Sequence, residues 1–180
     1  MQKRILPEHI TALVAEAKTN PEAFGGLYEH YVQPVYHYLY SRVGSSQEAE
    51  DLTSQTFFSA YEGMPRYRER GYFAAWLFRI AQSKLMDYFR KSKTWGYEVE
   101  QSTEGSSDAA DTLNELIEDE ELRQIRYLIR RLRDDEQELI RLRYVADLTF
   151  VEMAEVLGKR EDAVRKSHDR LLARLRSQME

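Results

Sequence analysis

Helical spacing of the apolar residues constrains this 180-residue chain more than any other feature. Only 8 glycines and 4 prolines interrupt the sequence, and no long stretch alternates polar and apolar residues. A 3.6-residue apolar period is typical of amphipathic helices, whereas strict alternation is typical of half-buried strands. The pattern therefore predicts an all-α fold. Hydrophobic residues make up 42% of the chain, which is enough for a packed core and argues against wholesale disorder.

Charge divides the chain into three parts. Residues 1–92 carry 11 basic and 10 acidic side chains, residues 93–121 carry 1 and 10, and residues 122–180 carry 14 and 11. The middle part is also rich in serine and glycine, as solvated linkers are. We therefore expect two small helical domains, 1–92 and 122–180, joined by an acidic linker. The net charge of −5 argues against nucleic-acid binding at face value, but it conceals two net-positive domains.

Three local patterns predict where helices begin. Asn20-Pro21 is typical of an N-cap followed by proline at the first helical position. The segments Ser45–Glu48 and Thr149–Glu152 both have the spacing of a capping box. Gly158 is placed to end the short helix that the second box begins.

The C-terminal domain contains the spacing of a helix-turn-helix motif. Ala154 is the small residue on the first helix, Gly158 lies in the turn, and Val164 is the apolar contact on the second helix. Between residues 158 and 178 there are 7 basic and 3 acidic side chains. In this motif the second helix enters the major groove, so Arg165 and Lys166 are candidates for guanine or phosphate contacts. The alternative is a plain helical hairpin with a solvated charged face.

In the N-terminal domain, residues 64–93 interleave aromatic and basic side chains, with 8 basic and 2 acidic residues. The Arg-rich stretch 65–71 is expected to be a loop, followed by a helix from about Tyr72. One stripe of this helix is apolar core, and a second carries Trp76 and Arg79. Bases stack on rings while cations follow the backbone, so the segment favours single-stranded nucleic acid. The alternative is a tryptophan that completes a small core beside a solvated basic face.

The preceding helix carries an aromatic residue on a polar stripe. Asp51, Gln55, Phe58 and Glu62 share one face by their spacing, and an exposed phenylalanine there indicates a protein-partner surface.

Other classes of chemistry have little support in the sequence. The absence of cysteine excludes disulfides, thiolate nucleophiles and cysteine–zinc sites. The four histidines do not have the spacing of a known metal motif, and no nucleophile–base arrangement can be inferred. We therefore expect no catalytic residues, no metal and no cofactor. With no apolar span and no signal-peptide core in MQKRILPEHI, the chain is expected to be cytoplasmic, without direct membrane insertion.

Taken together, three segments resemble the extracytoplasmic-function (ECF) sigma factors of bacterial RNA polymerase, in the family's order. Residues 23–61 are similar to regions 2.1–2.2, with the acidic-Leu-x-x-Gln-x-x-Phe pattern at 51–58. Residues 65–91 are similar to regions 2.3–2.4, and residues 132–176 to region 4. The resemblance implies a region 2 bundle and a region 4 helix-turn-helix. It implies binding to core polymerase, promoter DNA and, by analogy with many members, an anti-sigma protein.

The resemblance also implies a role for each site. The clamp helices of the polymerase's largest subunit would be bound by Asp51, Leu52, Gln55 and Phe58. The melted −10 element would be held by Arg66, Tyr67, Arg68, Arg70, Tyr72, Trp76, Arg79, Ser83 and Arg90. The duplex −35 element would be contacted by Lys159, Arg160, Arg165, Lys166, Asp169 and Arg170.

Two other functions remain open from the residues alone. An ordinary helix-turn-helix regulator would bind duplex DNA as a dimer, but it leaves segment 64–93 unexplained. A helical enzyme would use His30, His37 and nearby acids.

Overall fold

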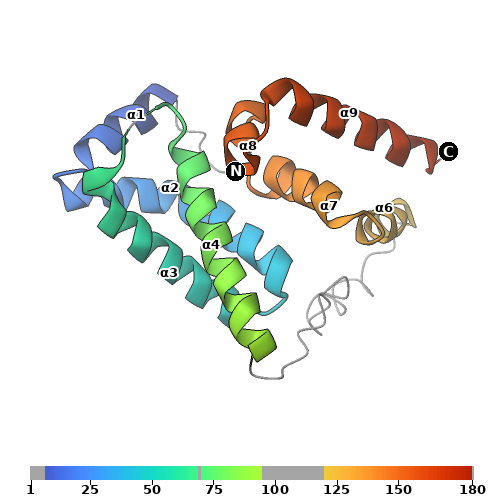
Figure 1. Ribbon diagram of the computed structural model, residues 1–180, viewed down its shortest axis with the longest axis horizontal. Helices are drawn as coiled ribbons and strands as arrows, with labels where there is room; N and C mark the ends of the chain where they lie inside the picture. Colours follow the sequence, from blue (N-terminus) through green and yellow to red (C-terminus); the bar gives the residue numbers. More distant parts are fainter. Residues whose placement is uncertain (1–6, 69, 95–119, 180) are drawn as a thin grey trace.

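The computed structural model describes residues 7–68, 70–94 and 120–179, and every regular element among them is helical (Figure 1). This confirms the all-α prediction. The N-terminal elements are α1 (Pro7–Glu16), α2 (Pro21–Val43), α3 (Ser46–Gly63), the 3₁₀ turn η1 (Met64–Arg66) and α4 (Phe73–Thr94). The C-terminal elements are α6 (Glu120–Arg130), α7 (Asp134–Ile140), the π-type turn η2 (Arg141–Val145), α8 (Phe150–Leu157) and α9 (Glu161–Ser177).

The helix ends form where the sequence predicts them. The Asn20 side chain accepts from the Glu22 amide, and Ser45 caps α3 by accepting from the Glu48 amide. At α8 the capping box is complete, because Thr149 and Glu152 bond reciprocally. The largest difference concerns the loop predicted at 65–71, whose first residues belong to η1.

The N-terminal bundle packs α2, α3 and α4 around one apolar core. Leu27 and Leu39 on α2 and Leu77 and Phe78 on α4 are fully buried. On α3, buried Thr56 donates its hydroxyl to the Leu52 carbonyl, so a polar residue sits in the core without an unpaired group. The predicted apolar stripe of α4 forms much of this core.

The C-terminal half folds as a helix-turn-helix. Gly158 adopts φ 63°, a left-handed conformation that lets α8 end at Leu157 and α9 begin at Glu161. Met153 and Val164 are buried at the contact between the two helices. Arg174 of α9 contacts Glu136 of α7 at 2.8 Å, and this hydrogen bond lowers the pKa of the Glu136 carboxyl.

A stability prediction follows from the turn. Gly158→Ala is expected to lower the free energy of unfolding by about 1 kcal/mol, because a Cβ is strained at positive φ. Gly25→Ala in mid-α2 is the control, since nothing lies within 4 Å of the added Cβ and its backbone is helical. The control is expected to be neutral or stabilising. Urea unfolding of both variants measures the difference, and equal changes would contradict the prediction.

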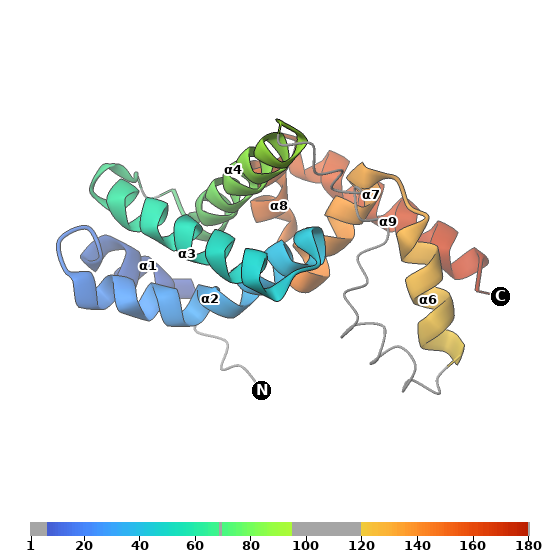
Figure 2. The ribbon, with the colours of Figure 1, turned by 90° about the horizontal axis from the view of Figure 1, so that it is seen from below.

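The N-terminal and C-terminal halves of the chain pack against each other. Figures 1 and 2 both show α8 beside α4, and η2 also packs on α2. Most of the buried apolar residues form one continuous cluster that includes Leu77 from the first half and Met153 from the second. The predicted linker 93–121 lies almost wholly outside the described residues, and the boundaries 1–92 and 122–180 stay a prediction.

A largely buried carboxylate joins the halves within this contact. Glu138 of α7 accepts from the Tyr38 hydroxyl at 2.7 Å, from Gln82 at 2.9 Å and from Arg42 at 3.1 Å. Its side chain is only 12% exposed. Burial raises the pKa of Tyr38 and lowers that of neighbouring Arg141. We call Glu138 with its N-terminal partners Tyr38, Arg42 and Gln82 the interdomain clasp.

Candidate nucleic-acid interface

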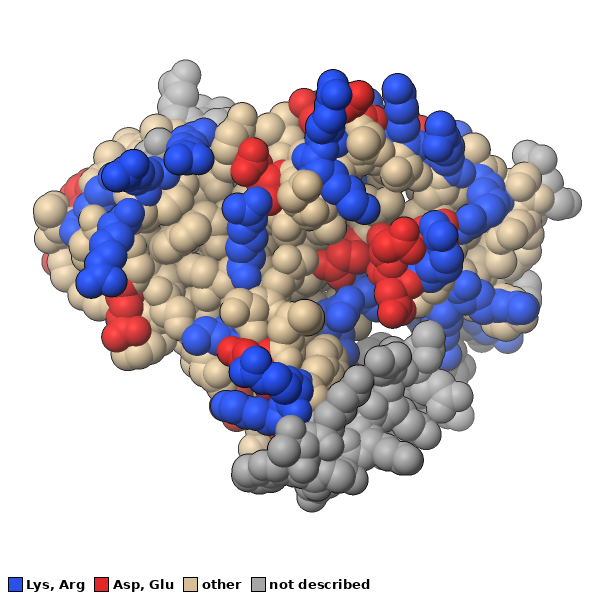
Figure 3. Space-filling model, viewed as in Figure 1, with Lys and Arg blue, Asp and Glu red and all other residues tan. Residues whose placement is uncertain are grey.

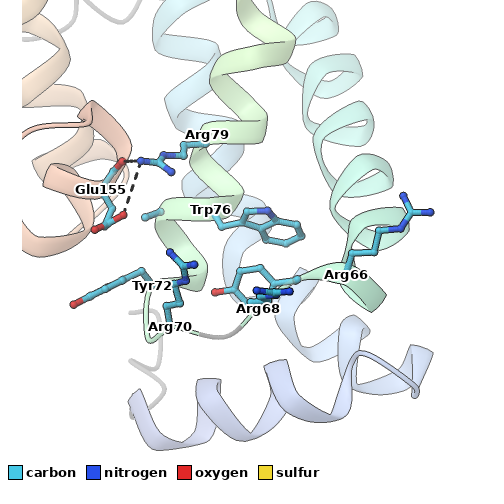
Figure 4. Close-up of a pocket in the computed structure, with 9 residues that line it drawn as sticks. Arg66, Arg68, Arg70, Tyr72, Trp76, Arg79 and Glu155 are labelled. Atoms are coloured by element: carbon cyan, nitrogen blue, oxygen red, sulfur yellow. Dashed lines mark hydrogen bonds and ion pairs between the residues drawn. The ribbon is translucent and has the colours of Figure 1, made fainter.

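An open pocket of about 310 Å³ lies at the start of α4. Its lining residues come from η1, the following loop and the first turns of α4, with one contribution from α8 (Figure 4). They are Arg66, Tyr67, Arg68, Arg70, Tyr72, Ala75, Trp76, Arg79 and Glu155. Seven of the nine residues predicted for the −10 element therefore gather in one place.

Two aromatic rings that contact each other at a tilt of 38° line this pocket. The ring centroids of Tyr67 and Trp76 are 4.5 Å apart, and both rings also contact buried Phe73. The Tyr67 amide donates to the carbonyls of Gly63 and Met64, which fixes the backbone that carries its ring. A Cβ at Gly63 would meet the Trp76 ring at 3.1 Å, so a glycine there leaves room for the indole.

Arginine side chains surround the rings. Figure 4 shows Arg70 to the left of the Trp76 ring, Arg68 below it and Arg66 to its right, with Arg79 directed toward Glu155. Arg66, Arg68, Arg70 and Arg79 are all exposed. Rings that can stack bases, bordered by cations that can pair with phosphates, are typical of single-stranded nucleic-acid sites.

One arginine of the pocket already has an acidic partner. The Arg79 guanidinium donates to the backbone carbonyl of Glu155 and lies 3.9 Å from its carboxylate. Glu155 belongs to α8, so a side chain of the C-terminal half borders the pocket of the N-terminal half. Sequence reasoning did not predict this contact, because it depends on how the halves pack.

Two predicted −10 residues lie outside the pocket. Ser83 and Arg90 are exposed farther along α4, and Arg90 pairs with Asp87 at 2.8 Å. Arg90 is about 21 Å from Trp76 along the helix axis at 1.5 Å per residue. These two residues would therefore contact a different part of any bound strand.

The second candidate surface is the outer face of α9. Val164, His168 and Leu171 bury its inner face, which leaves the predicted −35 residues outward. The exposed set comprises Lys159, Arg160, Arg165, Lys166, Asp169 and Arg170. Two of the arginines have acidic partners, because Arg165 donates to Glu161 at 2.7 Å and Arg160 lies 3.3 Å from Asp162.

Sequence reasoning missed an aromatic cluster beneath this surface. The Arg165 guanidinium lies over the Phe150 ring at 4.5 Å, and Arg143 lies over the same ring at 5.1 Å. Buried His168 contacts Phe150 edge-on and is 3.1 Å from the Tyr144 hydroxyl. The position of Phe150 directly after the Thr149 cap was visible in the sequence, but its contact with a residue 15 positions later was not.

The face of α3 that the sequence predicts to bind a protein partner is exposed at all of its predicted residues except one. Asp51, Gln55 and Phe58 are exposed, and Phe58 is 63% accessible. Leu52 is 3% exposed and lies in the core, so it supports this face from beneath and cannot itself form a direct contact. Tyr28 and Tyr61, also exposed, extend the aromatic character onto the adjoining surface.

Basic side chains gather on the molecular surface near both candidate nucleic-acid sites. Figure 3 shows basic side chains gathered over the loop before α4 and again along α9. Among the described residues, no group of three histidine or acidic side chains has the geometry of a metal site. Within the same ranges, no helix has the length and apolarity needed to cross a membrane.

Both halves of the chain match known protein families. The sequence profile for Sigma-70 region 2 matches residues 27–95, and that for Sigma-70 region 4 matches residues 128–177. A solved structure, that of CnrH in complex with the cytosolic domain of CnrY, is 23% identical. It covers 95% of this chain and 97% of CnrH with a TM-score of 0.68, which shows the shared fold.

Curated relatives carry the same family name. The ECF RNA polymerase sigma factor BldN of Streptomyces coelicolor is 36% identical over 80% of this chain, which spans 55% of BldN. SigW of Bacillus subtilis is 30% identical over 78% of this chain and 80% of SigW. SigD of Mycobacterium tuberculosis is 30% identical over 96% of this chain and 84% of SigD. With both regions matched in order on an all-α fold, the chain belongs to the ECF sigma factors of bacterial RNA polymerase.

Proposed function

We propose that this chain directs core RNA polymerase, in the bacterial cytoplasm, to promoters that it recognises at two separate elements. The pocket at the start of α4 would hold the melted −10 element, α9 would contact the duplex −35 element, and the exposed face of α3 would bind core polymerase. The chain would act as an initiation factor that positions an enzyme, with domains near 1–92 and 122–180 connected by segment 93–121.

The aromatic and cationic pocket is the observation that carries this proposal. A base that leaves the duplex loses its stacking partners, and the Tyr67 and Trp76 rings supply a replacement surface. Arg66, Arg68 and Arg70 are exposed around these rings, where the phosphates of a single strand would pass. A duplex-binding regulator has no use for such a pocket.

The described arrangement is a closed one. Promoter elements centred near −35 and −10 are about 25 base pairs apart, or roughly 85 Å at about 3.4 Å per base pair. Here a side chain of the −10 pocket, Arg79, contacts α8 of the helix-turn-helix directly. We infer that the halves separate when both elements are bound, and that Glu155 then releases Arg79.

In vitro transcription tests the proposal against its rivals. The purified chain and core polymerase are expected to initiate from members of a promoter pool randomised at both elements. A dimeric regulator would instead bind duplex DNA equally well without polymerase. An enzyme would lose its function in the His30→Ala, His37→Ala double variant, which here should still support transcription.

Phe58→Ala is expected to weaken binding to core polymerase roughly 10-fold or more, as truncation of an aromatic interface residue commonly does. The side chain is 63% exposed, so folding should be unchanged. Fluorescence titration with core polymerase measures the affinity, and circular dichroism measures helicity. Met86→Ala is the control, since Met86 is 72% exposed on α4. Unchanged affinity, or lost helicity, would contradict the assignment of this face.

We also propose that an anti-sigma protein regulates the chain. CnrH, which shares this fold, was solved with the cytosolic domain of CnrY. Such a partner would need to cover either the α3 face or the surfaces that contact DNA. Capture with the tagged chain from its own cells, repeated with Phe58→Ala, would identify a partner and test whether it competes at the polymerase face.

A further inference from the structure

The ring of Phe150 contacts an arginine of α9. Its partner, Arg165, stands on the outer face of α9, and the guanidinium carbon lies 4.5 Å from the ring centroid. The same guanidinium donates to the Glu161 carboxylate at 2.7 Å. One side of the guanidinium plane is thus covered by a ring and one donor is bound, while the side chain remains 52% exposed.

The ring itself is fixed from several directions. Phe150 is the first residue of α8, where the reciprocal Thr149–Glu152 bonds set the backbone. Buried His168 contacts the ring edge-on at 5.1 Å, and the Tyr144 hydroxyl lies 3.1 Å from the His168 Nε2 atom. A second guanidinium, that of Arg143, approaches the ring at 5.1 Å and donates to the Leu148 carbonyl at 2.8 Å.

We propose that Phe150 is a positioning residue that makes Arg165 specific for a base instead of a phosphate; this rests on the proposed role of α9 at the −35 element. A guanidinium has five donors in a rigid plane, and bidentate contact with guanine O6 and N7 requires that plane to face the base edge. Glu161 uses one of these donors and leaves the others for DNA. A phosphate, in contrast, accepts an arginine from many directions.

Fixing the orientation of the Arg165 guanidinium before DNA binds has a measurable consequence. An arginine that is already oriented loses less side-chain freedom when it binds, and only the correctly oriented contact gains from this. Without the Phe150 ring, Arg165 still supplies a positive charge near the DNA backbone, but its guanidinium adopts many orientations. Base discrimination should fall, while the salt-dependent, sequence-independent part of binding stays.

The test uses holoenzyme and a promoter pool randomised at the −35 region, selected first with the unmodified protein. Arg165→Ala identifies the base pair at which preference is lost. Phe150→Leu is expected to reduce preference at that same pair by about 2- to 5-fold, which corresponds to an exposed cation–π contact. Phe150→Tyr keeps the ring and is expected to keep the preference. In the Arg165→Ala background, Phe150→Leu should cause no further loss of preference.

The pattern of losses distinguishes a positioning role for Phe150 from a purely structural one. If Phe150→Leu weakens all −35 sequences equally, the ring has only a structural role and the proposal is overturned. The same holds if Arg165→Ala relaxes one base pair but Phe150→Leu leaves preference there unchanged. If Arg165→Ala changes no preference at any −35 position, the proposed role of α9 fails as well. Thermal unfolding of each variant identifies any loss caused by misfolding of the helix-turn-helix.

Discussion

Replacing Glu138 with alanine is expected to shift the chain from the closed arrangement toward separated halves. The carboxylate accepts three hydrogen bonds from the N-terminal half through Tyr38, Gln82 and Arg42. Tyr38 is 1% exposed, so its hydroxyl would lose its partner in a dry environment. Removing one partner of a fully buried ion pair costs about 3–5 kcal/mol. Because the side chains of Glu138 and Arg42 are 12% and 28% exposed, we expect a smaller cost of about 2 kcal/mol, or roughly 30-fold in an equilibrium constant.

The chain is suited to a direct distance measurement. It has no natural cysteine, so dyes attach only at introduced sites. Ala12→Cys on α1 and Ser177→Cys at the end of α9 are both exposed positions in opposite halves. Energy transfer between the dyes should fall when Glu138 is replaced. Core polymerase should bind the variant more tightly if the closed form competes with polymerase.

The control lies on the same helix. Asp135→Ala removes an acidic side chain from α7 whose ion-pair partner, Arg133, is in the same half, and both are largely exposed. It should leave energy transfer unchanged. Glu155→Ala tests the second contact between the halves and should free Arg79 from its carboxylate while leaving the clasp intact. If Glu138→Ala changes neither energy transfer nor polymerase affinity, the apolar packing and the Arg79–Glu155 contact hold the halves together without the clasp.

The sequence predicted the local structure well because caps, turns and apolar periods act over a few residues. The Asn20 cap, the Thr149 box and the positive φ of Gly158 were all predictable from side-chain chemistry at short range. The gathering of seven of the residues predicted for the −10 element also follows from local structure, since all of them lie between residues 66 and 79.

What the sequence did not predict depends on contacts between distant elements. Glu138 looks like an ordinary charge on a short helix, and only the packing of the two halves buries it beside Tyr38. Leu52 belongs to the family pattern, yet its place on α3 points it into the core. Phe150 looks like one more apolar residue until α9 folds back over α8 and brings Arg165 onto its ring.

Replacing Trp76 with alanine is expected to give the largest loss at the −10 element. Its indole lines the pocket and contacts the Tyr67 ring at a centroid distance of 4.5 Å. Base–aromatic stacking contributes about 1–3 kcal/mol per base, so binding of a single-stranded non-template oligonucleotide by holoenzyme should weaken about 5- to 150-fold. Trp76→Phe retains a ring and should lose less.

Comparing two templates tells whether Trp76 acts on the melted strand. On a duplex promoter, Trp76→Ala should reduce the permanganate reactivity of unpaired thymines together with transcription. On a template with the −10 region already unpaired, part of the loss should remain, because the stacking surface is still missing. Met86→Ala, on the outer face of the same helix, serves as the control and should behave like the unmodified chain on both templates. Full activity of Trp76→Ala on both templates would mean that the indole only completes the core beside Phe73, and that the captured base is held elsewhere.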